Sequence, residues 1–166
     1  MTGKEVTGFY EAHSRRLYNM SYRILLSRED AEEVMQDTIL KFVTMPFRPM
    51  SGEQVSAWLA KTCIRASIDR LRKRRRESLF LGEYAAEAAV ISDTEITEET
   101  DAGRILEAIQ KLPEPYRLVV NLILVEGLDY EETASYTGQK QSTLRSQYLR
   151  GKQKLMEILN KDGKQI

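Results

Sequence analysis

The sequence predicts an all-α fold of two small helical domains joined by a flexible acidic linker. Apolar residues recur at helical spacing along most of the 166 residues, without the sustained alternation of a half-buried strand. The segment 78–102 has no clean period and is rich in acidic, serine, threonine and alanine residues. We therefore place one domain at 1–77, the linker at 78–102 and a second domain at 103–166.

Three helices account for the first domain, each with its own apolar stripe. The stripe of the first helix includes His13, whose neutral ring we expect to pack rather than to react. The second helix begins at Ser27, whose hydroxyl can accept an early backbone N–H, and ends before Pro46. The third helix, from about 52 to 74, is expected to bury Ala57, Ala60, Ile64, Ile68 and Leu71.

The composition excludes several kinds of site. Cys63 is the single cysteine and His13 the single histidine, too few for an internal disulfide or a structural zinc site. No stretch approaches the roughly 20 apolar residues of a membrane span, and the first residues lack the apolar core of a signal peptide. We expect a cytoplasmic protein with no membrane insertion and no cofactor.

Charge is balanced overall, with 25 basic and 25 acidic residues, but it is divided into blocks. Residues 61–76 contain eight basic side chains and one acid, whereas residues 77–101 contain eight acids and no lysine or arginine. Residues 138–164 contain seven basic side chains and two acids. Two positive helices separated by an acidic segment indicate two contacts with a polyanion such as nucleic acid.

The C-terminal part of the chain is typical of a helix-turn-helix. Asp129 and Glu132 can cap a short helix, Gly138 can supply the turn, and a long basic helix follows from about 141 to 159. The residues expected to face inward on this second helix are Leu144, Tyr148, Leu155 and Leu159, and Gly151 indicates either close packing or a tolerated glycine. A recognition helix reads bases with its N-terminal residues and binds phosphates with basic side chains, so we predict contact with duplex DNA.

With both halves considered, the chain resembles bacterial RNA polymerase sigma factors of the extracytoplasmic-function (ECF) group, sigma-70 family members that keep only regions 2 and 4. The motifs that carry the resemblance in region 2 are DAEEVMQDT at 30–38, WLA at 58–60 and IDRLR at 68–72. Those in region 4 are LPEPYR at 112–117, EGLDYEETA at 126–134, TLRS at 143–146 and RGKQKL at 150–155.

The resemblance implies a region 2 bundle of three to four helices, a region 4 helix-turn-helix, and no catalysis. Its core RNA polymerase-binding residues would be Glu32, Glu33, Gln36 and Asp37. Those that open and hold the minus 10 element would be Lys61, Arg65, Asp69, Arg72, Lys73 and Arg76. Those that read the minus 35 element as duplex would be Gln141, Ser142, Thr143, Arg145, Ser146, Arg150 and Lys152. Promoter DNA, core polymerase and an inhibitory anti-sigma factor are the implied partners.

The sequence departs from the family pattern at three places. Ala66 stands where the family often has asparagine, and Thr133 stands where it usually has an aliphatic residue. Gln139 and Lys140 replace the apolar residue and serine that normally precede the recognition helix. The minus 35 preference therefore need not match that of other members.

Two other functions are compatible with parts of the sequence. A free-standing helix-turn-helix regulator would bind duplex DNA tightly without polymerase. It needs only the second half of the chain, so the acidic second helix and the basic third helix would have no function. A nucleic-acid-processing enzyme would need clustered carboxylates or a phosphate-binding glycine loop, and the acids of the linker lack ligand spacing.

Overall fold

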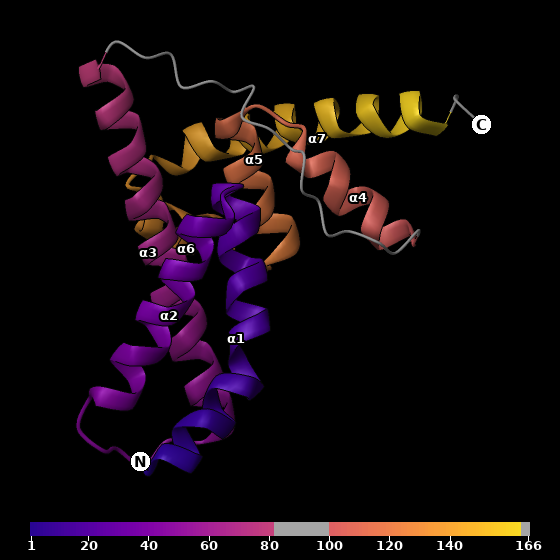
Figure 1. The fold of residues 1–166 in the computed structure, drawn as a ribbon. Helices are drawn as coiled ribbons and strands as arrows, with labels where there is room; N and C mark the ends of the chain where they lie inside the picture. Colours follow the sequence, from indigo (N-terminus) through magenta and orange to yellow (C-terminus); the bar gives the residue numbers. More distant parts are fainter. Residues whose placement is uncertain (82–99, 164–166) are drawn as a thin grey trace. The chain divides into compact units, whose positions relative to one another are not determined.

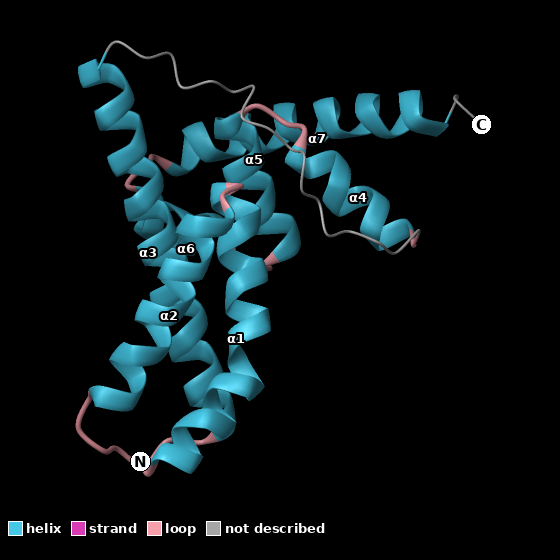
Figure 2. Ribbon diagram, viewed as in Figure 1, coloured by secondary structure: helices cyan, strands magenta, loops and turns pink. Residues whose placement is uncertain are grey.

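The structure is a computed structural model that describes residues 1–81 and 100–163, and every regular element in these residues is helical (Figures 1 and 2). The chain divides into two compact units, one within Met1–Ala85 and one within Ala86–Ile166. The predicted all-α class with two helical domains is confirmed. Most of the predicted linker lies outside the described residues.

The first unit is a bundle of three helices, α1 (Gly3–Leu25), α2 (Arg28–Thr44) and α3 (Gly52–Leu81). Leu26 ends α1 in a left-handed conformation (φ 50°), and the Ser27 hydroxyl then accepts the Asp30 N–H at 3.2 Å to start α2. The predicted cap of the second helix is therefore present. The connection is short, and α1 and α2 pack side by side.

The interior of this bundle combines large aliphatic side chains with a few hydrogen-bonded polar groups. Leu17, Leu59 and Leu71 are fully or almost fully buried. The Ser67 hydroxyl lies 2.8 Å from the Ser21 hydroxyl, and the Cys63 thiol donates to the Leu17 carbonyl at 3.4 Å. Cys63 is therefore a buried packing residue of α3.

Aromatic rings close the end of the bundle where the chain begins. Phe9 stacks on Phe42 with 4.6 Å between ring centroids, and Phe42 meets the edge of Trp58 at 5.6 Å. The His13 ring lies 4.5 Å from Phe9, and burial followed by the charge of Arg16 lowers its pKa. The expectation of a neutral, packed histidine agrees with these contacts.

The third helix differs from its predicted form in length and in phase. It continues to Leu81 rather than ending near residue 74, because the intervening residues include neither proline nor glycine. Ala57 is exposed, whereas Leu59 and Cys63 occupy the interior. The buried stripe is thus rotated toward Leu59 at the start of α3.

The second unit contains α4 (Asp101–Gln110), α5 (Glu114–Val120), a π-helical turn η1 (Asn121–Val125), α6 (Tyr130–Thr137) and α7 (Gln141–Gly163). Its core is formed by Ala108, Ile109, Leu112, Val120 and Leu155. None of the helices in the described part of the chain combines the length and apolarity of a membrane span.

The predicted helix-turn-helix is present in α6 and α7. The Asp129 carboxylate accepts the Glu132 N–H at 2.8 Å, and the Glu132 carboxylate accepts the Asp129 N–H at 3.2 Å. Gly138 ends α6 in the left-handed region, with φ 73°. Thr133 is fully buried where the family usually has an aliphatic residue, and its hydroxyl donates to the Asp129 carbonyl at 2.8 Å.

Of the two expectations for Gly151, close packing is the one that the structure supports. A Cβ atom at this position would lie 2.8 Å from Cγ2 of Val120 and 3.4 Å from Cβ of Tyr116. Glycine therefore lets α7 cross α5 at a distance that no larger residue allows without movement. This crossing determines which side of α7 faces solvent.

Candidate polymerase-binding and DNA-binding surfaces

One side of α2 forms an acidic face that contains all four residues predicted to bind the polymerase. Its opposite side is buried through Val34, Met35 and Ile39. The helical period therefore turns the intervening polar residues outward together. The acidic face consists of the exposed residues Glu32, Glu33, Gln36 and Asp37.

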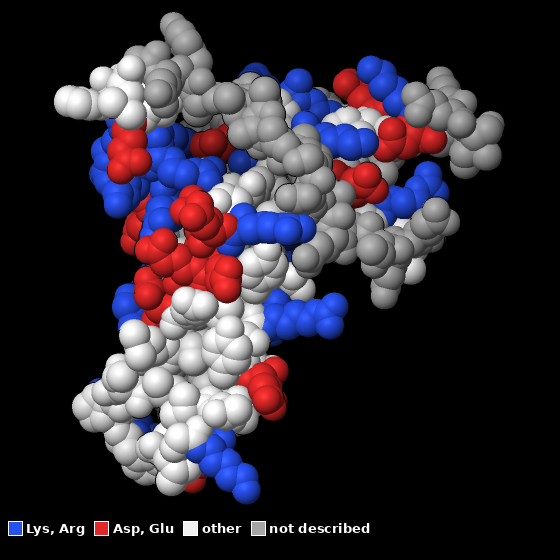
Figure 3. Space-filling view, viewed as in Figure 1, with Lys and Arg blue, Asp and Glu red and all other residues white. Residues whose placement is uncertain are grey.

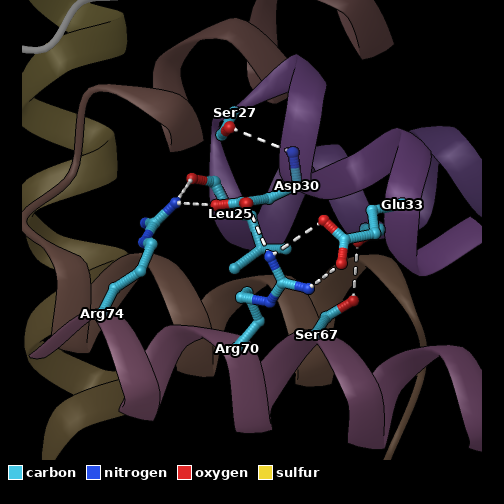
Figure 4. A network of polar contacts seen from close by, with 8 residues as sticks. Leu25, Ser27, Asp30, Glu33, Ser67, Arg70 and Arg74 are labelled. Carbon is cyan, nitrogen blue, oxygen red and sulfur yellow. Dashed lines mark hydrogen bonds and ion pairs between the residues drawn. The ribbon is translucent and has the colours of Figure 1, made fainter. Parts of the chain in front are cut away.

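One member of the acidic face is also tied to α3 (Figure 4). Arg70 Nη2 lies 2.7 Å from Glu33 Oε1, and Arg70 Nη1 lies 2.9 Å from Asp30 Oδ1. Arg74 Nη1 donates to Asp30 Oδ2 at 3.2 Å and to the Leu25 carbonyl at 2.9 Å. Two arginines of α3 thus hold the start of α2.

This network changes the electrostatics of Glu33. The hydrogen bond from Arg70, and then its charge, lower the pKa of Glu33 below its ordinary value. The same contact raises the pKa of Arg70. With 56% of its side chain exposed, Glu33 still reaches solvent while Arg70 neutralises part of its charge. Glu32, Gln36 and Asp37 are therefore better placed than Glu33 to bind a basic protein surface.

A second exposed surface runs along α3. Lys61, Arg65, Arg72 and Arg76 follow one another at spacings of four, seven and four residues, which places them on one side of the helix. We call these four residues the basic stripe. Arg70 and Arg74 lie on the side that meets α2. Figure 3 shows basic side chains gathered over α3 and acidic side chains over α2.

The remaining two residues predicted to contact the minus 10 element border the basic stripe. Lys73 is exposed beside it. Asp69 lies next to the stripe, with its Oδ1 3.9 Å from Arg72 Nη1. A carboxylate repels phosphate, so Asp69 is suited to orient Arg72 or to accept a hydrogen bond from a base.

Sequence reasoning missed an apolar pocket of about 810 Å³ at the end of the bundle. The connection between α2 and α3 forms one wall, with Phe47 92% exposed and Arg48 next to it. Phe9 and Phe42 contribute from α1 and α2. The signal in the sequence was the run Pro46-Phe47-Arg48-Pro49, in which an aromatic residue and a cation interrupt a helical pattern.

The start of α7 presents the side chains predicted to read the minus 35 element. Leu144 is fully buried, Leu155 is 5% exposed, and Tyr148 and Leu159 are half-buried, so the predicted inward positions are confirmed. The Ser146 hydroxyl donates to the Ser142 carbonyl at 3.2 Å. The predicted DNA-facing residues are all exposed: Gln141, Ser142, Thr143, Arg145, Ser146, Arg150 and Lys152.

Two tyrosines hold two of these cations. The Arg145 guanidinium carbon lies 5.3 Å from the centre of the Tyr130 ring, and Lys152 Nζ lies 4.7 Å from that of Tyr148. The two rings meet edge to face, with centroids 6.2 Å apart. Burial, followed by the interaction with Tyr130, raises the pKa of Tyr148. Helical periodicity in the sequence assigns Tyr148 to the core only.

The fold and these surfaces define a two-domain helical DNA-binding protein with a helix-turn-helix in its second domain. The family description "Sigma-70 region 2" matches residues 9–77, and "Sigma-70, region 4" matches residues 102–155. The chain belongs to the sigma-70 family, and within it to the ECF group of sigma factors.

Similar proteins support this assignment. The chain is 31% identical over 156 residues to the ECF RNA polymerase sigma factor SigE of Mycolicibacterium smegmatis, covering 90% of this chain but only 59% of that relative. It is 26% identical to RNA polymerase sigma factor SigV of Bacillus subtilis, covering 88% of this chain and 85% of SigV. The sigma factor RpoE of Bartonella quintana, solved with the anti-sigma factor NepR, has the same fold, with a TM-score of 0.62, 23% identity and coverage of 95% of this chain and 98% of RpoE.

Proposed function

We propose that this chain binds core RNA polymerase and directs it to promoters, with region 2 opening the minus 10 element and region 4 reading the minus 35 element. The observation that carries this proposal is that a single helical bundle presents two surfaces of opposite charge. The acidic face of α2 suits a basic protein surface, while the basic stripe of α3 suits DNA phosphates. A free-standing regulator would use neither.

The residue assignments follow from exposure and chemistry. Glu32, Gln36 and Asp37 bind the polymerase, and Glu33 contributes while Arg70 holds it. The basic stripe and Lys73 bind the phosphates of the melted strand, next to Asp69. The apolar pocket takes an unstacked base, because aromatic side chains with a nearby arginine stack on bases of any sequence.

Region 4 supplies the duplex contacts. Gln141, Ser142, Thr143, Arg145 and Ser146 lie at the start of α7, the part of a recognition helix that reaches base edges. Arg150 and Lys152, one to two turns later, bind phosphates. We also propose the domain limits 1–77 and 103–166, since α3 buries its last apolar core residue at Leu71. The helices extend a few residues past these limits, because α3 ends at Leu81 and α4 begins at Asp101.

The chain itself carries out no reaction in this proposal. It lends sequence recognition to the polymerase, in the cytoplasm where polymerase and chromosome meet. RpoE was solved with an anti-sigma factor, and we extend such an inhibitory partner to this chain.

Transcription in vitro from a pool of random promoter sequences tests the proposal. Core polymerase with this chain should produce RNA from templates that share two motifs separated by a fixed spacer, and core alone should not. No enrichment of templates, together with tight binding of the free chain to duplex DNA, would instead favour a free-standing regulator.

A further inference from the structure

Arg145 is the first cationic residue within α7, and its side chain contacts an aromatic ring of the preceding helix. Its guanidinium carbon lies 5.3 Å from the centre of the Tyr130 ring, within the 6 Å at which a cation is attracted to an aromatic face. Tyr130 belongs to α6, so this contact crosses the helix-turn-helix. The first cationic side chain of α7 is therefore restrained by the preceding helix.

The Tyr130 ring is itself held in place by two features. It is the first residue of α6, directly after Asp129, whose reciprocal cap with Glu132 fixes the backbone there. Its ring meets Tyr148 of α7 at an interplanar angle of 74°. An edge-to-face contact of this kind is a favourable aromatic geometry. Tyr130 is thus a fixed platform rather than a mobile surface ring.

We propose that Tyr130 is a positioning residue for base recognition: its ring face holds the Arg145 guanidinium so that the N–H edge is presented to a base. The proposal rests on the proposed function of α7 in reading the minus 35 element. An arginine that binds two acceptors of one base needs its planar group in one orientation. A ring in contact with the guanidinium restricts its movement before DNA binds and reduces the entropy lost on binding.

Three single variants and one double variant separate this role from simple packing. Tyr130→Phe keeps the ring face and the edge contact with Tyr148. Tyr130→Leu keeps an apolar side chain but removes the π face. Arg145→Ala removes the guanidinium that the ring holds, and the double variant Tyr130→Leu with Arg145→Ala shows whether the ring acts through Arg145.

The measurement is a ratio of two affinities at fixed salt. It is the affinity of polymerase holoenzyme for a selected minus 35 element divided by its affinity for versions in which each base is changed in turn. Arg145→Ala should lose discrimination at the position it reads. Tyr130→Leu should lower the ratio at that position roughly threefold, the effect of an exposed cation–π contact, with the salt dependence unchanged. Tyr130→Phe should keep the ratio, and Tyr130→Leu should have no effect when Arg145 is already alanine.

Three results would overturn the inference; the first two leave the proposed function of α7 standing, and the third does not. If Arg145→Ala lowers discrimination but Tyr130→Leu does not, Tyr130 has no positioning role and the reading of the minus 35 element stands. If Tyr130→Leu lowers the ratio equally in the Arg145→Ala background, the ring acts through packing alone. If Arg145→Ala changes nothing, the base-reading assignment of Arg145 is wrong as well.

Discussion

Replacing all four residues of the basic stripe by glutamine is expected to weaken promoter binding by roughly 10² to 10³ at about 0.1 M salt. Each contact with a single-strand phosphate contributes about 0.7 to the slope of log affinity against log salt. Loss of four contacts therefore lowers the slope by about three. The substituted residues are Lys61, Arg65, Arg72 and Arg76.

The measurement is a salt titration of polymerase holoenzyme binding to promoter DNA whose non-template strand is unpaired over the minus 10 element. The matched control removes the same charge at exposed residues outside the candidate surfaces: Lys4, Arg15, Arg104 and Lys161. The control should reduce the slope far less. Equal slopes for the two variants would show that the basic stripe has no special place in DNA binding.

Gly151→Val should lower the free energy of unfolding of the second unit by about 3 kcal/mol, the upper end of the cost of overpacking. The added Cβ alone would lie 2.8 Å from Cγ2 of Val120, and the branched side chain adds two more carbons to the contact with α5. Gly8→Val is the matched control, because no atom lies within 4 Å of a Cβ at Gly8 in α1. It should change stability by less than about 0.5 kcal/mol.

Denaturant unfolding of the full chain separates the two units. Trp58 is the single tryptophan and lies in the first unit, so its fluorescence follows that unit alone, while helical circular dichroism follows both. Gly151→Val should move the unfolding transition of the second unit, seen only by circular dichroism, to lower denaturant concentration. The fluorescence transition of the first unit should not move. An unchanged or raised transition would mean that α5 and α7 do not cross as closely as the structure shows.

Local signals in the sequence were sufficient to predict most of the helices and the caps at Ser27 and Asp129. The Ser27 hydroxyl and the Asp129 carboxylate each accept a hydrogen bond from the backbone N–H three residues later. Such short-range contacts can be recognised from neighbouring residues in the sequence. Gly151 could likewise be singled out, because a glycine in the middle of a helix is costly, but the sequence did not decide between close packing and a tolerated glycine. The exposed residues of α7 followed from helical periodicity alone.

Contacts between distant residues could not be predicted in the same way. Arg70 and Glu33 are 37 residues apart, and nothing local distinguishes Arg70 from the neighbouring arginines of the basic stripe. The phase of α3 was wrong at Ala57 because small residues pack on either side of a helix, and only the position of α1 decides which side is covered. The apolar pocket required the connection between α2 and α3 to fold back on α1.

The central claim is that the acidic face of α2 binds core RNA polymerase, and gel filtration of the chain with purified core tests it most directly. The wild-type chain should co-elute with core, and the variant with Glu32, Gln36 and Asp37 changed to alanine should co-elute weakly. The variant leaves Glu33 in place so that the contact with Arg70 is kept. A control with exposed Glu11, Asn19 and Glu53 changed to alanine should behave as wild type. Failure of the wild-type chain to bind core, with tight binding to duplex DNA alone, would contradict the account.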